Sequence, residues 1–369
     1  MKNNNLFDEA PIESWKYPSN SYVNNSTRRL FHNLNKIGQS SQVILGHQST
    51  NTLSRNGQIE ITDSDIKEVT GQFPGLVAYD LGWIERKKGN VWLDGSVDKL
   101  IKSIQYCRKL GIPVSLSWHT RNPTDVQYDQ KNRALNGKVK NIQNTVGQIL
   151  SDETVQQTYI SWLDILAEFF GKLVDETGEV IPILFRPFHE CSGNWFWWGN
   201  GQCTDEEYIK LFQFTHEYLT KTKMVDNLLW IYNTDKVRTE AEYMKRYPGD
   251  QYVDFCSIDF YDYENYSIDK FKSLLTKSLD VLRACSKRQN KGYLIAEGGK
   301  KNYQDQNYFT SRCINFFPKD LIYFCFWANS KKNYYTTSQR DQNKEDFKVM
   351  VKENKLLLQK EVLKLKLFS

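Results

Sequence analysis

Eight short apolar segments recur along this 369-residue chain, and amphipathic segments separate them. Most of the apolar segments lack strict alternation, which is typical of parallel strands buried on both faces. An eightfold strand–helix alternation favours an α/β fold of the (β/α)8 TIM barrel type over an open doubly wound sheet. The predicted strands are 43–48, 76–81, 113–119, 181–189, 228–233, 253–261, 293–298 and 321–327.

The segments between these strands carry helical signals. Apolar residues recur at helical spacing over 97–110 and 162–173. Thr204 and Glu207 have the spacing of a capping box, which predicts the start of another helix. A final helix is predicted from about residue 345 to residue 359.

No internal domain boundary is visible in the sequence. We expect one catalytic domain over residues 1–369, with residues 1–40 as an N-terminal extension that wraps the barrel. Residues 121–152 form a long polar segment, which is predicted to be an active-site loop. A dinucleotide-binding sheet would need a Gly-rich turn after its first strand, and Gly46-His-Gln-Ser lacks that pattern.

Charge and hydropathy narrow the range of partners. The net charge is +5 over 49 basic and 44 acidic side chains, and no basic stripe interleaved with aromatic residues points to nucleic acid. No apolar run approaches the ~20 residues of a transmembrane helix. The N-terminus lacks the apolar core of a signal peptide, so the chain is either cytoplasmic or begins after a removed signal.

Seven cysteines are scattered along the chain without a C-x-x-C pair, which argues against a zinc site. Cys191 and Cys203 bracket a Trp-rich segment. Both a disulfide bridge that fixes this segment and two free thiols remain open from the sequence.

The ends of the predicted strands share a chemical character. Polar and aromatic residues occur at the C-terminal end of almost every one, and in a (β/α)8 barrel the catalytic groups lie at that end. Ordinary core strands would not end in this way eight times. These residues are His47, Gln48, Asp80, Trp83, Trp118, His119, Arg186, His189, Glu190, Asn233, Asp259, Tyr261, Glu297 and Trp327.

Two of these residues are glutamates, Glu190 on the fourth strand and Glu297 on the seventh. Glutamate seldom ends an apolar strand without a partner. Retaining glycosidases use two carboxyl groups about 5–5.5 Å apart, one as nucleophile and one as acid and base. A salt-bridged residue at the rim is an alternative for either glutamate alone, but it explains the pair less well.

The two glutamates need different surroundings, because a nucleophile must be ionised and an acid must hold a proton. Arg186 is expected to keep Glu297 ionised, and Tyr261 to donate a hydrogen bond to the same carboxylate. Glu190 is expected to lie against Trp195 and Phe188, where desolvation would raise its pKa.

An aromatic cluster, Trp195-Phe-Trp-Trp198, follows Glu190. Aromatic rings beside a carboxylate suit carbohydrate chemistry, because the rings stack on the apolar faces of pyranoses. The alternative is a core cluster that only holds the loop. At least one of these rings is expected to have that packing role.

Three histidines, His47, His119 and His189, lie at predicted strand ends. Together with a glutamate they could ligate a metal such as zinc. However, His47 stands alone where barrel metallohydrolases usually carry a His-x-His pair. Hydrogen bonding to sugar hydroxyls is the preferred role, because a neutral imidazole both donates and accepts.

In these motifs the chain resembles glycoside hydrolase family 26, of the clan of (β/α)8 enzymes with catalytic glutamates on strands four and seven. His189 narrows the clan to this family, because most of the clan has Asn before the acid. The matching segments are Gly46-His-Gln48, Ser117-Trp-His119 with Asn122-Pro123, Arg186-Pro-Phe-His-Glu190, Gly193-Asn-Trp-Phe-Trp-Trp-Gly199, Asp259-Phe-Tyr261, Ala296-Glu297-Gly298 and Trp327.

The family consists mainly of β-1,4-mannanases, with some lichenases (β-glucanases) and xylanases, acting with retention and without a metal or other cofactor. By position the resemblance implies Glu190 as acid/base and Glu297 as nucleophile, oriented by Tyr261. It implies that Trp195 lines the first leaving-group subsite. The expected substrate-binding residues are His47, Trp118, His119, Arg186, His189, Trp195, Trp198, Asp259, Tyr261 and Trp327.

One position departs from the family pattern. Ala328 follows Trp327 where family members often carry an arginine that binds a distal glycone sugar. This predicts a short glycone site and makes mannobiose release an alternative to internal cleavage, with segments 83–95 and 121–152 as candidate walls. The expected substrates are mannan, galactomannan and manno-oligosaccharides, and the resemblance implies an exported protein. The alternatives are a lichenase or xylanase and a non-catalytic glycan-binding barrel.

Overall fold

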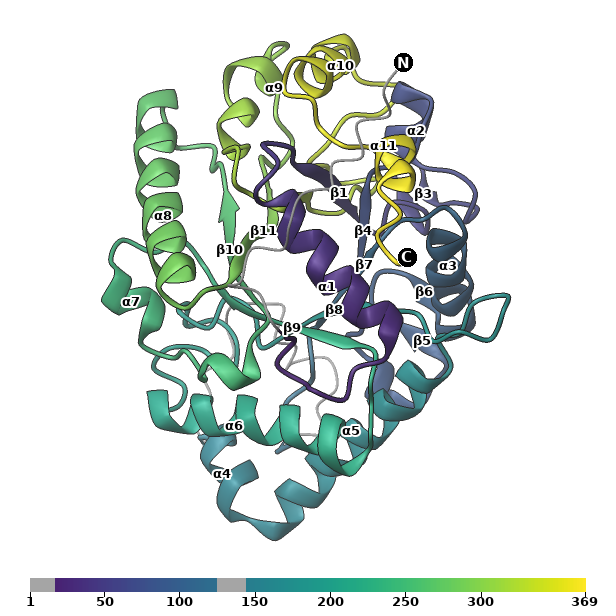
Figure 1. Cartoon of the computed structure of the whole chain (residues 1–369). Coiled ribbons are helices and arrows are strands. Elements are labelled where there is room, and N and C mark those ends of the chain that lie inside the picture. The colour runs from purple at the N-terminus through teal and green to yellow at the C-terminus, as the bar shows by residue number, and fades with distance from the viewer. Residues whose placement is uncertain (1–16, 125–143) are drawn as a thin grey trace.

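The computed structural model describes residues 17–124 and 144–369, and its centre is a closed barrel of parallel strands (Figure 1). The strands follow one another around the barrel in chain order, and the last pairs with the first. The (β/α)8 prediction is therefore confirmed. The barrel strands are β1 (Ile44–Gln48), β4 (Leu76–Asp80), β7 (Val114–Trp118), β8 (Ile183–Pro187), β9 (Leu228–Thr234), β10 (Phe255–Tyr261), β11 (Gly292–Gly299) and β12 (Tyr323–Phe326).

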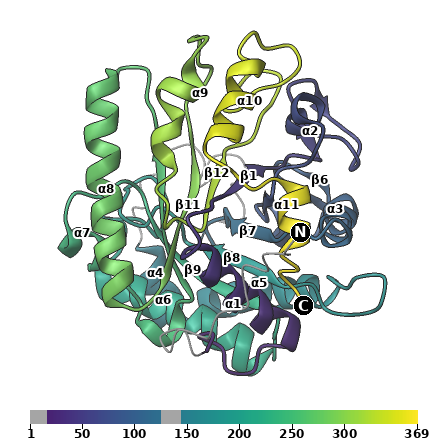
Figure 2. The same ribbon diagram turned by 45° about the horizontal axis from the view of Figure 1, so that its top comes forward.

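Helices surround the barrel (Figure 2). They are α1 (Asn25–Ile37), α2 (Asp65–Thr70), α3 (Val97–Lys109), α4 (Thr145–Ser151), α5 (Glu153–Gly171), α6 (Asp205–Glu217), α7 (Glu240–Met244), α8 (Ile268–Arg288), α9 (Tyr308–Ser311), α10 (Lys344–Glu353) and α11 (Gln359–Lys364). Short hairpins pair β2 (Leu53–Ser54) with β3 (Gly57–Gln58) and β5 (Asn90–Val91) with β6 (Gly95–Ser96). Helix α6 starts with the predicted capping box. None of the described helices has the length and apolar character needed to cross a bilayer.

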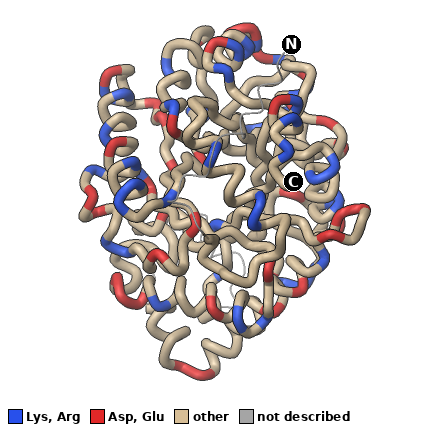
Figure 3. Tube along the Cα trace, in the orientation of Figure 1, with Lys and Arg blue, Asp and Glu red and all other residues tan. Residues whose placement is uncertain are grey.

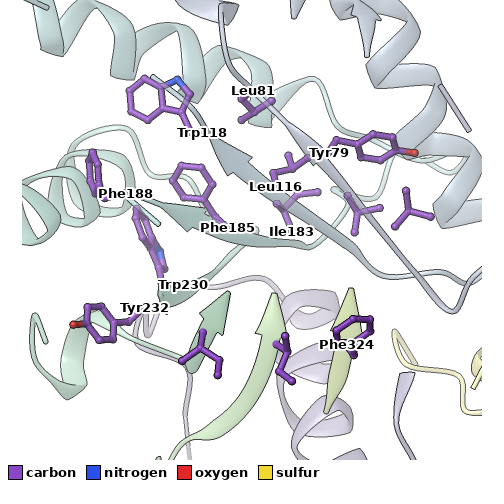
Figure 4. Packing of buried hydrophobic residues seen from close by; sticks show 14 of the residues in the cluster. Tyr79, Leu81, Leu116, Trp118, Ile183, Phe185, Phe188, Trp230, Tyr232 and Phe324 are labelled. Carbon is purple, nitrogen blue, oxygen red and sulfur yellow. The ribbon is translucent and has the colours of Figure 1, made fainter. Parts of the chain in front are cut away.

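Side chains alternate between the lumen and the outer face along each barrel strand, because successive residues of a strand point to opposite faces. On β7, Leu116 and Trp118 belong to the core between the strands and the helices. Ser117 and His119 have the opposite parity and reach Asp80 at the barrel mouth. Figure 4 shows part of the outer layer, in which Trp118, Phe185 and Trp230 extend away from the strands.

Helix α1 closes the N-terminal end of the barrel and crosses it in Figure 1. Leu30, Phe31 and Leu34 share one buried cluster with lumen residues such as Leu229 and Phe255, which lie near the starts of their strands. In the described part of the chain this end is therefore filled by apolar side chains, which leaves the opposite end, where the strands have their C-termini, for a candidate site.

The predicted N-terminal extension, 1–40, and the predicted active-site loop, 121–152, both include residues outside the described part of the chain. From the N-terminal extension, 17–40 is described, and the backbone N–H and hydroxyl of Ser19 donate to Asp254 just before β10. In segment 121–152, residues 125–143 lie outside the described part, and α4 occupies residues 145–151. The loop prediction is therefore wrong for α4, whose N-cap is Asn144 with a side chain that accepts from the Gly147 N–H.

The prediction of one final helix over 345–359 is also wrong. Helix α10 ends at Glu353, Lys355 has a positive φ of 52°, and an extended segment leads to α11. In that segment Leu357 packs with the barrel lumen cluster, while Leu356 and Leu358 pack in the outer cluster. Three consecutive leucines would point to different sides of a helix, whereas an extended segment buries all three against the barrel.

Charged residues of both signs are interspersed along the outer helices, as α8 and α10 show (Figure 3). This distribution agrees with the small net charge of +5.

Candidate active site

The end of β8 turns sharply and brings Glu190 to the barrel mouth. Phe188 and Glu190 have positive φ angles of 51° and 52°, a conformation that non-glycine residues rarely adopt. The backbone N–H of Glu190 donates to Asn233 Oδ1 at 2.8 Å, which stabilises the turn. Strained backbone of this kind gathers at functional sites.

Strand β11 delivers Glu297 through an irregularity in its pairing. Ile258 pairs with Ile295, but the next residue, Asp259, pairs with Glu297, so Ala296 is the extra residue of a bulge. Leu294 belongs to the lumen cluster and Ile295 to the outer one. Strict alternation would therefore point Glu297 outward, and the bulge turns it into the barrel mouth.

A buried arginine holds the carboxylates beneath the mouth. Arg186 Nη1 donates to Asp259 Oδ2 at 2.6 Å, and its Nη2 donates to Glu297 Oε1. Tyr261 donates its hydroxyl proton to Glu297 Oε2 at 2.8 Å. Because each oxygen of Glu297 accepts from a donor and one donor is cationic, this site stabilises a negative charge on Glu297.

Glu190 has the opposite environment. Burial raises its pKa well above the usual range, and the negative charges of Asp259, Asp235 and Glu297 raise it further. Trp195 Nε1 donates to Glu190 Oε2 at 2.6 Å and opposes that rise. Glu190 is thus suited to hold a proton, and Glu297 to carry a charge.

Glu190, Asp259 and Glu297 each offer a carboxylate oxygen, and these oxygens lie within 4.8 Å of one another. In the described part of the chain, this is where three potential metal ligands come together. However, Arg186 already donates to two of the three carboxylates, so its positive charge neutralises part of the charge that would attract a cation. The short separation of Glu190 and Glu297 fits attack by one carboxylate while the other transfers a proton.

Asp80, His119 and His189 form a chain of side-chain contacts at one wall of the site. His119 Nδ1 lies 2.6 Å from Asp80 Oδ2, and His119 Nε2 lies 3.1 Å from His189 Nε2. Asp80 also accepts from Ser117 and from the Gly82 N–H. Burial, followed by the charges of His119 and Arg186, lowers the pKa of His189 well below its usual value, so His189 is neutral.

An aromatic wall includes a residue that the sequence reasoning missed. Trp327 and Trp92 are partly exposed, with ring centroids 6.3 Å apart, and the Trp92 ring lies 5.2 Å from that of His119. Trp92 belongs to the β5–β6 hairpin, within the segment 83–95 that was expected to form a wall. A tryptophan in such a polar segment was a signal that could have singled it out.

Four of the expected substrate-binding residues have no exposed surface. Trp118, Trp198, His47 and Asp259 are 0% exposed, so, contrary to the expectation, none of them offers a surface to a sugar in this structure. Trp118 packs on Tyr159 outside the barrel, and the Trp198 ring stacks 4.5 Å from Phe196. Like Leu116 two residues before it, Trp118 points from β7 toward the surrounding helices.

His47 also points away from the barrel lumen. Side chains alternate along β1, and Leu45, two residues before His47, lies in the outer cluster, whereas Ile44 lies in the lumen cluster. His47 Nδ1 lies 2.8 Å from Thr50 Oγ1, and burial lowers the pKa of His47 to about 3. His47 is therefore a neutral packing residue, and the three histidines do not converge on one point.

The open question about the cysteines is answered by the loop geometry. Cys191 and Cys203 are both free thiols. Arg246 instead holds this loop, since its guanidinium donates to the backbone carbonyls of Cys191, Trp198 and Cys203. Asn233 was noted only as a strand end, yet it links Glu190 to Asp259 through hydrogen bonds of 2.8 and 2.9 Å.

A (β/α)8 barrel that presents two differently solvated glutamates from its fourth and seventh strands has the architecture of a glycoside hydrolase. The sequence profile of glycosyl hydrolase family 26 matches residues 19–313. The chain therefore belongs to glycosyl hydrolase family 26.

Individual relatives agree with this assignment. A mannan endo-1,4-beta-mannosidase of Bifidobacterium adolescentis is 26% identical over 360 residues, covering 90% of this chain and 34% of the relative. One of Bacillus subtilis is 30% identical over 223 residues, covering 58% of each chain. The solved structure of a GH26 beta-mannanase from Bacteroides ovatus superimposes with a TM-score of 0.86 at 27% identity, covering 94% of this chain and 98% of that one. The chain thus spans about a third and 58% of the lengths of the two sequence relatives.

Proposed function

We propose that this protein is a retaining β-1,4-mannanase that hydrolyses mannan, galactomannan and manno-oligosaccharides by double displacement. The observation that carries the proposal is the pair Glu190 and Glu297, whose oxygens lie within 4.8 Å and whose surroundings differ. Glu297 accepts from Arg186 and Tyr261, whereas burial raises the pKa of Glu190.

In the first step Glu297 attacks the anomeric carbon of the sugar at the barrel mouth. The bond from that carbon to the glycosidic oxygen breaks as Glu190 gives its proton to this oxygen. The products are a glycosyl ester on Glu297 and the released leaving group. Glu190 is then a carboxylate.

In the second step Glu190 removes a proton from a water molecule, and that water attacks the anomeric carbon. The ester bond to Glu297 breaks, and Glu190 is protonated again. Two inversions at the same carbon give overall retention of configuration. Tyr261 remains bonded to Glu297 and orients it toward the carbon.

The remaining side chains of the mouth suit a neutral sugar. Trp327 and Trp92 offer ring faces for the apolar side of a pyranose. His119 lies beside Trp92 with its two ring nitrogens bonded to Asp80 and His189, so it holds this wall of the site in place. Trp195 lies beside Glu190 and is suited to the first leaving-group sugar. The choice of mannose rests on the relatives, which are named as mannan-cleaving enzymes. An intact polysaccharide cannot enter a cell, so the proposal includes export.

The decisive experiment is chromatography of the products released in parallel from mannan, galactomannan, lichenan and β-1,3-xylan. We expect release from the two mannans, with retained configuration in the first products. Faster release from lichenan or xylan would replace the proposal with the glucanase or xylanase alternative. Binding to all four polymers without turnover would identify a glycan-binding barrel.

The lengths of the products released from mannohexaose distinguish internal cleavage from release of mannobiose at a chain end. Ala328 stands where family members often carry a distal glycone arginine, which keeps release of mannobiose from a chain end as an alternative to internal cleavage. A spread of product lengths at early times would contradict this and establish internal cleavage.

A further inference from the structure

A half-exposed aromatic ladder leads away from the candidate catalytic centre. Tyr261, which bonds Glu297, lies 6.5 Å from the ring of Tyr263, and Tyr263 lies 5.4 Å from Tyr266. Tyr263 is 44% exposed and is one of the few large hydrophobic rings of the described residues with this much open surface. All three tyrosines lie at or just after the end of β10.

A charged pair from the neighbouring loop lies against this ladder. Lys236, just after β9, places its Nζ 5.2 Å from the centroid of Tyr263 and 2.9 Å from Asp235 Oδ2. Asp235 is 8% exposed, and its backbone N–H donates to Ser192 Oγ at 3.1 Å. Ser192 is two residues after Glu190, so the loops after β8, β9 and β10 meet here.

The contact between Asp235 and Ser192 shows on which side of the site this group lies, because Ser192 follows Glu190 by two residues in the same loop. Glu190 protonates the departing oxygen in the proposed reaction, so a sugar on its side belongs to the leaving group. In agreement, beyond the effect of burial, the charge of Asp235 raises the pKa of Glu190, and the charges of Asp235 and Glu190 raise that of Tyr263.

We propose that Tyr263, together with Lys236 as positioned by Asp235, forms a leaving-group subsite for a neutral pyranose unit beyond the one beside Trp195. This inference rests on the proposed function. The exposed part of the Tyr263 ring offers an apolar surface to the C–H face of a pyranose. Lys236 uses one N–H toward Asp235, and its ammonium group has two more donors for sugar hydroxyls.

Surface packing alone would explain an exposed tyrosine, and Tyr22 is 70% exposed at a distance from the site. It does not explain the Asp235–Lys236 pair, which has side chains only 11% and 30% exposed. Removing a carboxylate from water costs free energy, and exposed pairs without this burial are far commoner. The partly buried Asp235–Lys236 pair lies beside the exposed ring of Tyr263 and on the side of Glu190, and this combination supports a binding site.

The test compares two substrates in Tyr263→Ala. Mannohexaose can extend over the proposed subsite, whereas 2,4-dinitrophenyl β-mannobioside ends at the first leaving-group position. We expect kcat/KM for mannohexaose to fall roughly fivefold to tenfold, the size of one lost aromatic contact. We expect kcat/KM for the aryl substrate to stay within about twofold, because surface changes away from the contact have small effects.

Two controls separate ring contact from folding. Tyr263→Phe keeps the ring and should retain most of the activity on mannohexaose. Tyr22→Ala should leave kcat/KM unchanged for both substrates. A second readout is transfer of the mannobiosyl group from the enzyme to added mannobiose, which should drop relative to hydrolysis in Tyr263→Ala.

The outcomes are distinguishable. If Tyr263→Ala leaves mannohexaose cleavage and transfer unchanged, the subsite does not exist while the proposed function stands. If both substrates lose activity equally, Tyr263 acts through structure, and the inference is wrong. If the unchanged protein cleaves neither substrate, the proposed function itself fails.

Discussion

The indole N–H of Trp195 donates a 2.6 Å hydrogen bond to Glu190 Oε2. The ring proposed to bind the first leaving-group sugar is thus also bonded to the proposed acid. A donor to a carboxylate stabilises its charged form and lowers its pKa. In the proposed reaction, one side chain therefore links substrate binding to proton transfer.

Trp195→Phe retains a ring and removes this donor, so the pKa of Glu190 should rise further. Glu190 must be protonated for the first step, and activity is present below its pKa and lost as the pH rises through it. The alkaline limb of kcat/KM on a manno-oligosaccharide should therefore move to higher pH. A limb that stays in place or moves down would show that Glu190 is not the titrating acid.

Asp235→Asn should shift the same limb in the opposite direction. The charge of Asp235 raises the pKa of Glu190, and its removal leaves Lys236 as an unpaired cation nearby. Both changes favour ionised Glu190, so the alkaline limb should move to lower pH. Measuring the pH dependence of kcat/KM for both Trp195→Phe and Asp235→Asn compares the directions of the two shifts. If both limbs move in the same direction, Glu190 is not the group that titrates.

Glu297→Ala should abolish hydrolysis and accept azide as an external nucleophile. With 2,4-dinitrophenyl β-mannobioside, azide should give the inverted mannobiosyl azide, identified by its one-bond C1–H1 NMR coupling. Hydrolysis at the unchanged rate would exclude Glu297 as nucleophile.

Glu190→Ala should lose about 10²–10⁴-fold on mannohexaose, which is the usual contribution of a general acid. The dinitrophenyl substrate needs no protonation of its leaving group and should lose far less in the first step. Burst kinetics measure that step directly. Equal losses on the two substrates would assign Glu190 another role.

Arg186→Met should unfold at a much lower urea concentration. Arg186 is 2% exposed and bonds both Asp259 and Glu297, so its loss leaves two buried carboxylates without a cation. Breaking a buried charge pair costs about 3–5 kcal/mol. Arg29 is exposed, and Arg29→Met should stay within about 0.5 kcal/mol. A small effect at Arg186 would show that the carboxylates are protonated together.

Trp118→Ala and Trp327→Ala should separate stability from activity. Trp118 is 0% exposed in the outer core, and its truncation should cost about 3–5 kcal/mol in unfolding free energy with little change in kcat/KM of the folded protein. Trp327→Ala should show the reverse, a small stability change and a large loss of activity. Loss of activity in a fully folded Trp118→Ala would place that ring near the substrate after all.

The fold was accessible from the sequence because a parallel barrel needs two-sided apolar strands. Runs such as Ile181–Phe188 can be buried only between a lumen and a helix layer. The strand ends then identified the candidate site, since parallel strands deliver their C-terminal residues to one rim. Trp92 was missed because it lies on a hairpin outside this repeating pattern.

The sequence by itself therefore determined the barrel, its candidate catalytic rim and the position of the glutamate pair, which all follow from local apolar pattern and chain order. The tertiary structure decided which rim residues face the lumen. A strand alternates its side chains, so Trp118 and His47 lie in the outer core while His119 reaches the mouth. Glu297 faces the mouth only because β10 and β11 pair through a bulge, which depends on contacts between two separate strands.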